Sequence, residues 1–284
     1  MDRRTARHDA ATSGSLPGDD SLLDPGARVL VVVAHPDDEA FWFTPVLRRA
    51  AHIVAALPVH TDDEVVTRGR ERVLADYPIA TFEFLPFKEA GVYRRSNWRL
   101  REPAELGVTL RRLSSAARAR AYRENYETLL EALDPYVRAH EVVFSHNPWG
   151  EYGHEEHVQV SSVVTALARR HGRSVWVLDG LPARVLRSDG MRLRSDFYEE
   201  KIRHLPRTSF DTDLELFRSI RHLYESHLAW TGSPIYEPPQ KSEYVQLVRE
   251  GDLLLEPGPP VHGRILRVGA RALALDGPHR AMRY

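Results

Sequence analysis

Residues 28–34 read Arg-Val-Leu-Val-Val-Val-Ala, a continuous run of apolar and mostly β-branched side chains. A strand with one wet face alternates apolar and polar residues, whereas a strand covered on both faces is apolar throughout. The run therefore predicts a central strand of a parallel sheet, because parallel sheets carry helices on both faces. This one segment already favours an α/β fold.

The following residues alternate between strand and helix patterns, which extends that prediction. Pro135 is expected to end one of these helices, since proline removes a backbone donor. The expected strands are 28–34, 52–59, 80–85, 141–145 and 174–178, and the expected helices are 40–51, 67–77, 116–133 and 155–170. The pattern predicts a Rossmann-like, doubly wound, mostly parallel sheet over residues 27–180.

Two flanking regions do not fit this alternation. Residues 1–26 are rich in Ser, Gly, Asp, Ala and Arg without periodicity, and we expect a disordered tail. Residues 181–284 are expected to form a C-terminal extension that packs on the core. Its expected elements are a helix at 209–230, capped by Ser209 or Asp211, and short strands at 264–268 and 271–275.

Composition excludes several classes of protein. The 284 residues are 42% hydrophobic and 28% charged, which is close to the globular average. The formal net charge of -1 gives no basic excess for binding nucleic acid. No apolar run approaches the ~18 residues of a membrane span, and the first 25 residues lack the apolar region of a secretory signal. We therefore expect a cytoplasmic protein; the sequence does not predict its oligomeric state.

Cysteine is absent, which excludes disulfides, thiol nucleophiles and thiolate zinc sites together. The chain has 14 histidines, so a transition-metal site would have to be built from histidine and carboxylates. A catalytic metal site is therefore expected in a segment that combines histidine with aspartate or glutamate.

The first such segment is Ala34-His-Pro-Asp-Asp-Glu39, directly after the first strand. Ligands of open α/β sheets bind beyond the carboxyl ends of the strands, so this turn is well placed for a site. The simpler alternative is an acidic loop that caps the next helix. No Gly-x-Gly-x-x-Gly pattern follows the strand, which argues against a dinucleotide site.

The second segment, Ser145-His-Asn-Pro-Trp-Gly-Glu-Tyr-Gly-His-Glu-Glu-His157, follows another buried strand and opens on the same edge. His154 and His157 are three residues apart at a helix start and share one face. The spacing is not His-Glu-x-x-His, so it is not that of a zincin. Taken by itself, such a pair is explained equally well by packing or helix capping as by metal binding. Combined with the first segment, a His, Asp and His set suits catalytic zinc.

Together the two segments resemble the PIG-L (LmbE-like) family of zinc-dependent N-acetylglucosaminyl de-N-acetylases, over roughly residues 27–180. The resemblance implies that His35, Asp38 and His157 bind zinc. It implies that Asp37 is the general base and that His154 is the general acid or the oxyanion partner. Glu39 would support these residues without binding the metal itself.

This chain departs from the family pattern in two places. Phe43-Thr-Pro45 stands where the family often has a glycine pair. Leu85-Pro-Phe-Lys-Glu-Ala90 stands where it often has Pro-Asp-Gly, whose Asp helps orient the catalytic histidine. Glu89 is one substitute for that Asp, and a group from elsewhere is the other.

Several further residues are candidates for substrate binding. Arg68 matches the family's Arg-x-x-Glu stretch, although a solvent-exposed helix arginine fits as well. Trp149 and Tyr152 have rings that can stack on a sugar, and packing over the site explains them equally. Residues 61–64 suit either sugar hydroxyls or a helix cap, and the arginines of 94–112 suit either an anion or a mixed-charge surface.

The sequence thus predicts a zinc-dependent hydrolase that removes an N-acetyl group from an acetamido sugar or sugar conjugate, a small molecule. One alternative is a metal-dependent amidase for another amide, such as a thiol conjugate or an antibiotic intermediate. Another is a non-catalytic metal- or glycan-binding module, which the presence of both Asp37 and His154 disfavours. The ligand set also suits iron or cobalt, so the native metal stays open.

Overall fold

The computed structural model describes residues 26–79, 81–95, 110, 115–148, 150–179 and 205–248. Within these residues seven strands form one sheet in the order β3-β2-β1-β4-β5-β7-β6. The strands are β1 (Val29–Val33), β2 (Ala50–Ala55), β3 (Phe82–Phe84), β4 (Val142–Ser145), β5 (Ser174–Leu178), β6 (Arg207–Asp211) and β7 (Lys241–Val248). Strands β1 to β5 pair in parallel, while β7 is antiparallel to both β5 and β6.

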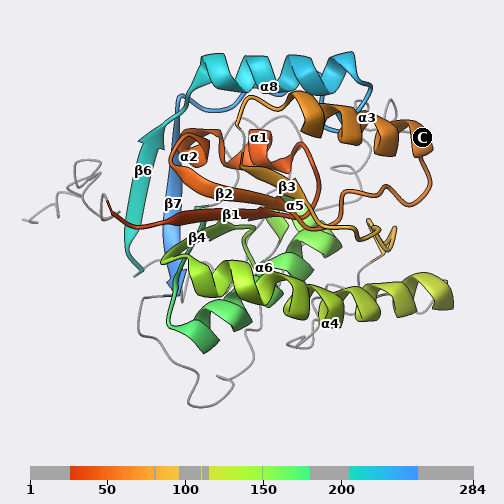
Figure 1. Cartoon of the computed structure of the whole chain (residues 1–284), viewed down its shortest axis with the longest axis horizontal. Coiled ribbons are helices and arrows are strands. Elements are labelled where there is room, and N and C mark those ends of the chain that lie inside the picture. The colour runs from red at the N-terminus through yellow and green to blue at the C-terminus, as the bar shows by residue number, and fades with distance from the viewer. Residues whose placement is uncertain are drawn as a thin grey trace, which may run out of the picture.

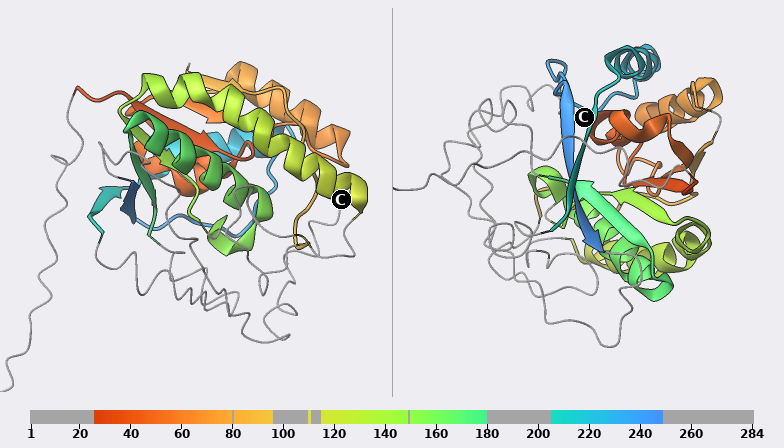
Figure 2. Two further views of the ribbon diagram at one scale, coloured as in Figure 1. Left: turned by 90° about the horizontal axis from the view of Figure 1, so that it is seen from below. Right: turned by 90° about the vertical axis from the view of Figure 1, so that its left-hand side faces the viewer.

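Helices cover both faces of this sheet, which confirms the expected α/β class (Figure 1). One layer holds α1 (Asp38–Trp42), α2 (Thr44–Leu47), α3 (Glu64–Asp76) and α8 (Leu214–Ser226). The other holds α4 (Ala116–Ala139), α5 (Gly150–Gly153) and α6 (Glu155–His171). Figure 2 shows the two layers on opposite sides of the strands.

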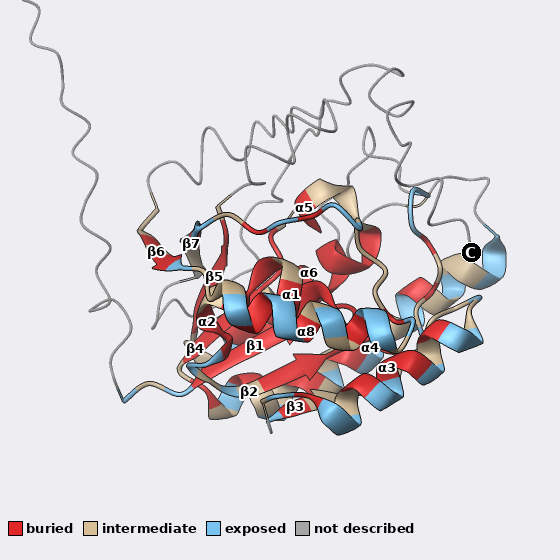
Figure 3. Cartoon of the chain, turned by 90° about the horizontal axis from the view of Figure 1, so that it is seen from above, coloured by how far each residue is buried: buried red, intermediate tan, exposed pale blue. Residues whose placement is uncertain are grey.

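Strand β1 sits at the centre and explains why its sequence is apolar throughout. Val31 and Val33 pack into the core beneath α1, α2 and α8, whereas Leu30 and Val32 pack into the core beneath α4 and α6. Figure 3 shows β1 buried along its length, whereas β2 is buried only in its second half, from Ile53 to Ala55, and exposed residues lie on the outer surfaces of α3, α4 and α8.

The two chemistry-bearing segments meet because of the strand order. Strand β1 pairs with β2 on one side and with β4 on the other, so the chain changes direction across the sheet between β1 and β4. Ligand sites of doubly wound sheets lie at this switch point, beyond the carboxyl ends of the strands. The turns after β1 and β4 are therefore neighbours in space.

The predicted helix at 40–51 is wrong in its second half. Two short helices, α1 and α2, occupy the region, and β2 already begins at Ala50. Pro45 lies in the first turn of α2, where its missing N–H costs nothing, so it starts a new helix after Phe43.

The prediction that Pro135 ends a helix is also wrong. Helix α4 continues to Ala139, and Leu129, Leu133 and Val137 form a buried row at a four-residue spacing. They lie in the same apolar core as residues of α6, and this packing offsets the hydrogen bond that proline removes.

The region after residue 204 differs most from expectation. Ser209 and Asp211 lie in β6, and α8 is capped instead by Asp213, whose carboxylate accepts the Leu216 N–H at 2.9 Å. Strand β7 was not predicted, and it joins β6 to the parallel part of the sheet.

Some predictions lie outside the described residues: residues 1–25 of the tail, most of the segment 86–115, and the strands at 264–268 and 271–275. The division of the chain at residue 180 stays a prediction. Among the described helices, none has the length and apolarity needed to cross a membrane.

Candidate metal-binding and catalytic site

The turn after β1 is buried and closed by its own side chains. The backbone N–H of His35 donates to Asp38 Oδ2 at 2.9 Å, and the N–H of Asp37 donates to Glu39 Oε2 at 2.9 Å. Asp37 has φ 94°, in the left-handed region that short polar side chains tolerate best after glycine. The turn thus fixes three adjacent carboxylates, each in different surroundings.

The turn after β4 is organised around Glu151. Its carboxylate accepts the backbone N–H of Asn147 at 3.0 Å, and its own N–H donates to the Asn147 side chain at 2.8 Å. Glu151 also has positive φ, 53°, and is fully buried. The turn delivers His154 to the N-cap of α6 and His157 to its first turn.

His157 faces two carboxylates, one through each ring nitrogen. Its Nδ1 lies 2.7 Å from Glu151 Oε2, and the carboxylate fixes the proton on that nitrogen. Nε2 is buried without a hydrogen-bond partner and lies 3.2 Å from Asp38 Oδ2. The Nε2 atom of His157 therefore lies beside a carboxylate oxygen without a hydrogen bond to it, an arrangement that suits a bound cation.

His35 completes this group from the other turn. Its Nε2 lies 3.2 Å from Glu156 Oε2, and its Nδ1 lies 3.3 Å from Asp38 Oδ2. Burial opposes a charge on His35, but the nearby Glu89 carboxylate and hydrogen bonds to Asp38 and Glu156 raise its pKa to about 10.

These distances fit a divalent ion. Ligand atoms about 2.1 Å from a tetrahedral zinc ion lie about 3.4 Å from one another. The distances from Asp38 Oδ2 to the two histidine nitrogens are 3.3 and 3.2 Å. The orphaned His157 Nε2 and the spacing of the three groups thus support a metal site here.

Among the described residues, three sets have ligand atoms within 4.8 Å of one another: His35, His154 and His157; Asp38, His146 and His157; and His35, Glu89 and Glu156. However, both ring nitrogens of His146 are engaged. Nε2 accepts the Ala34 N–H at 2.8 Å, and Nδ1 donates to Glu151 Oε2 at 2.9 Å. His146 therefore has no ring nitrogen left for a metal in this arrangement, and the ligand set His35, Asp38 and His157 stays a prediction.

Asp37 lies beside this group but is held differently. Its Oδ2 accepts two hydrogen bonds from Thr231, from the backbone N–H at 2.7 Å and from the hydroxyl at 2.8 Å. Burial and the charge of Asp38 raise the pKa of Asp37 to about 7, against the opposing effects of Arg70 and Thr231. A carboxylate with such a pKa can accept a proton near neutral pH.

His154 stacks on the ring of His157 with centroids 4.4 Å apart, and Tyr93 stacks at 4.7 Å. Its Nδ1 accepts the backbone N–H of Glu156 at 3.3 Å, so the proton lies on Nε2. Burial, together with His157 and His35, lowers the pKa of His154 well below its ordinary value. The structure therefore favours a neutral His154 that donates through Nε2–H.

The match to a family model covers both turns. Residues 30–168 match the PIG-L family, described as GlcNAc-PI de-N-acetylase. This part of the chain belongs to the PIG-L family. The resemblance noted from the two motifs is thereby confirmed, and the protein is a hydrolase of the de-N-acetylase class. No curated protein sequence matches the chain significantly.

Three solved structures are similar to this chain at low sequence identity. A deacetylase in complex with teicoplanin, from the teicoplanin biosynthesis pathway, is 13% identical with a TM-score of 0.47, covering 79% of this chain and 99% of that one. The A40926 pseudoaglycone deacetylase is 12% identical with a TM-score of 0.42, covering 79% and 98%. The N,N'-diacetylchitobiose deacetylase from Pyrococcus horikoshii is 12% identical with a TM-score of 0.39, covering 72% and 70%. These likenesses are too distant to assign a substrate.

The remaining residues predicted for this PIG-L site divide into three groups. Tyr152 lies at the site, with its ring 5.6 Å from that of His157, and burial raises the pKa of its hydroxyl well above the ordinary value. Trp149 lies outside the described residues. The Glu89 carboxylate accepts a hydrogen bond from Arg70 at 2.8 Å and lies within 4.8 Å of ligand atoms of His35 and Glu156, and its role in orienting His154 stays a prediction.

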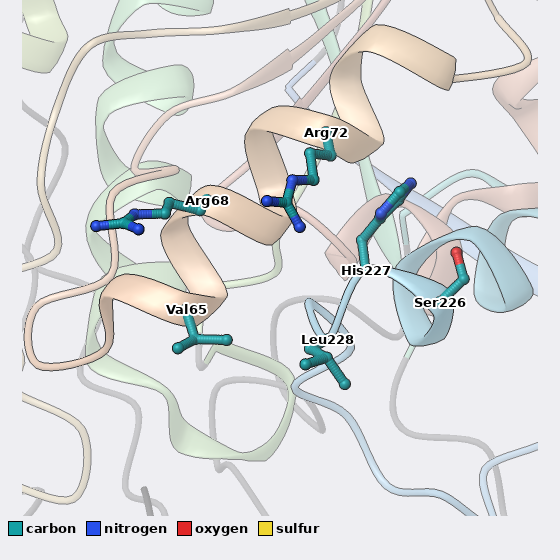
Figure 4. A pocket seen from close by; sticks show the side chains of 6 residues that line it. All are labelled: Val65, Arg68, Arg72, Ser226, His227 and Leu228. Atoms are coloured by element: carbon teal, nitrogen blue, oxygen red, sulfur yellow. The ribbon is translucent and has the colours of Figure 1, made fainter.

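Arg68 fits the second of its two predicted alternatives, a solvent-exposed helix arginine. It pairs with Glu64 at 2.5 Å on the exposed side of α3. It lines a hollow of about 220 Å³ between α3 and the segment after α8 (Figure 4). The other lining residues are Val65, Arg72, Ser226, His227 and Leu228, none of which belongs to the metal group.

Sequence reasoning missed several residues that shape the site. Arg70 is buried beside Glu89, and its position between Val66 and Val73 on the buried stripe of α3 was a usable signal. Glu39 Oε1 accepts hydrogen bonds from Tyr77 at 3.0 Å and from Tyr224 at 2.9 Å. Tyr224 comes from distant sequence and had no local signal.

Proposed function

We propose that this protein is a zinc-dependent N-deacetylase that acts on an acetamido sugar or a sugar conjugate. The family match supports de-N-acetylation in general, and the metal, the residue roles and the substrate class are the proposal. The observation that carries it is the buried Nε2 of His157, which has no hydrogen-bond partner and faces Asp38 Oδ2 at 3.2 Å.

In this proposal His35, Asp38 and His157 hold the ion. Glu156 fixes the proton on Nε2 of His35, and Glu151 fixes the proton on Nδ1 of His157, so each ring offers its other nitrogen toward Asp38. When bound, zinc supplies Lewis acidity, which makes a water molecule a competent nucleophile at neutral pH.

Asp37 then transfers the proton, and His154 stabilises the developing charge. Asp37 accepts the proton that the attacking water loses as the new C–O bond forms. His154, with its proton on Nε2, stabilises the negative charge that develops on the carbonyl oxygen. The C–N bond breaks as the leaving nitrogen takes up the proton that Asp37 accepted, so Asp37 returns to its carboxylate form and the products are acetate and a free amine.

The substrate side of the site includes Tyr152, whose ring lies 5.6 Å from that of His157. An amphipathic ring beside the metal group suits stacking on a sugar face. Trp149 precedes the same turn and is the second ring proposed for this task. The ligand is a small molecule, and the cytoplasm remains the predicted compartment.

A pair of variants in the first turn tests the proposal. Asp38→Ala removes a ligand, so zinc content and activity are expected to disappear together. Asp37→Asn keeps the ligands, so zinc content and KM stay near wild type while kcat falls by two or more orders of magnitude, the usual scale for loss of a general base. Zinc analysis and kinetics with N-acetylglucosamine conjugates measure both.

Three outcomes would contradict the proposal in different ways. An Asp37→Asn protein that loses zinc would reverse the roles of the two aspartates. If both variants keep wild-type zinc content and kcat, the turn has no role in catalysis. Amine release from other N-acyl amides, with none from acetamido sugars, would retain the hydrolase and replace the substrate class.

A further inference from the structure

A segment outside the family-matched residues reaches the catalytic turn. Thr231 follows α8 and lies 194 positions from Asp37, yet it donates two hydrogen bonds to one carboxylate oxygen of that residue. The backbone N–H lies 2.7 Å and the hydroxyl 2.8 Å from Asp37 Oδ2. Within the described residues, every hydrogen bond to this carboxylate comes from Thr231.

The segment around Thr231 is held in place by Phe41, a residue of α1. The ring of Trp230 stacks on Phe41 with centroids 4.4 Å apart and planes at 23°. On the other side of Thr231, a Cβ atom at Gly232 would lie 1.6 Å from the Phe41 ring, so only glycine fits. The hydroxyl of Tyr236 donates to the Phe41 carbonyl at 2.8 Å. The segment and the turn are therefore packed as one unit.

The backbone shows why Asp37 needs this support. Asp37 is the N-cap residue of α1, and an N-cap aspartate usually turns its carboxylate onto the free N–H groups of its own helix. Here the carboxylate makes no such capping bond. Thr231 donates to the carboxylate in place of the helix N–H groups, which keeps the carboxylate away from the helix end. Among the described residues, Asp37 Oδ1 then has no hydrogen-bond partner.

We infer that Thr231 is a positioning residue that aims the Asp37 carboxylate for proton transfer. The inference rests on the proposed role of Asp37 as the base. Two donors on Oδ2 fix the plane of the carboxylate, so Oδ1 becomes the oxygen that faces the water. The two motifs do not predict this contact, because the donor lies in another part of the chain.

Thr231→Val tests the hydroxyl alone, because valine keeps the shape and the backbone N–H. We expect kcat to fall about 10- to 100-fold, the scale of a hydrogen bond to a charged group, with KM and zinc content unchanged. Thr231→Ser restores the donor and is expected to recover most of the rate. Thr128→Val on α4, which removes an exposed hydroxyl bonded to the Glu124 carbonyl, is the matched control and leaves kcat unchanged.

A double-mutant cycle with Asp37→Asn separates positioning from general damage. If Thr231 acts through Asp37, Thr231→Val lowers kcat much less in the Asp37→Asn background. An equal loss in both backgrounds, or no rescue by serine, would overturn the inference in favour of a structural role. If Thr231→Val has a wild-type kcat while Asp37→Asn is inactive, the inference about Thr231 is wrong and the proposed base stands. A fully active Asp37→Asn would instead refute the proposed base.

Discussion

Glu151→Gln is the substitution whose effect follows most directly from the geometry. The Glu151 carboxylate accepts three hydrogen bonds in a fully buried position: from Nδ1 of His146 at 2.9 Å, from Nδ1 of His157 at 2.7 Å, and from the N–H of Asn147 at 3.0 Å. Glutamine has the same shape but offers only one acceptor oxygen. Its amide group must therefore face at least one N–H donor.

Either orientation of the amide damages the site. If the NH₂ group faces the histidines, the proton of His157 is driven to Nε2, where it blocks the lone pair that faces Asp38. If it faces Asn147, a backbone N–H is left buried without an acceptor, at a cost of about 1–3 kcal/mol. Loss of a partner that orients a metal ligand lowers metal affinity about 10- to 100-fold, or roughly 1.4–2.8 kcal/mol.

Competition of each purified protein with a chromophoric chelator measures the zinc Kd. Glu124→Gln on α4 is the matched control, because it makes the same chemical change in an exposed pair with Arg120 and is expected to leave the Kd unchanged. Urea unfolding in excess chelator shows that each variant folds. A folded Glu151→Gln protein with the wild-type zinc Kd would refute the role assigned to this carboxylate.

Three further outcomes follow. Chelation should abolish activity but leave a cooperative thermal transition, because β1 and its neighbours bury their apolar faces without the metal; a globally unfolded chelated protein would contradict this. His154→Ala should keep zinc and lose about 10²- to 10³-fold in kcat, the scale for loss of one oxyanion donor, and wild-type kinetics would exclude His154 from the chemistry. Arg28, through its side-chain and backbone hydrogen bonds, lowers the pKa of Glu141 to about 2. The difference in unfolding free energy between wild type and Glu141→Gln should therefore be full above about pH 4.5 and fade as pH falls toward 2, which urea melts at several pH values can measure; a difference independent of pH would refute the pair.

The fold was predictable where local sequence determines structure. The apolar run of β1 fixes a strand buried on both faces, and the turns after β1 and β4 must then open on one edge. The predictions failed where tertiary packing overrides local preference. Helix α4 passes through Pro135 because the buried row of Leu129, Leu133 and Val137 continues beyond it.

The residues of the candidate site were likewise predictable where they lie in a short local motif. His35, Asp37, Asp38, His154 and His157 lie in two short segments, and the structure brings the segments together. The predicted roles of these residues stay predictions. The residues that hold them were missed for a physical reason: Thr231 and Tyr224 act through contacts that exist only once α8 and the following segment have docked.

That long-range support has a consequence for how the protein folds. The hydrogen bond from Tyr224 to Glu39 spans 185 positions, and that from Thr231 to Asp37 spans 194. Contacts between such distant parts of a chain close late, because the loop entropy is lost before they form. Helices and the parallel strands can therefore assemble around a catalytic turn that is still loose. In a refolding experiment, hydrolytic activity would return after the far-ultraviolet circular dichroism signal, on the timescale at which α8 settles over α1.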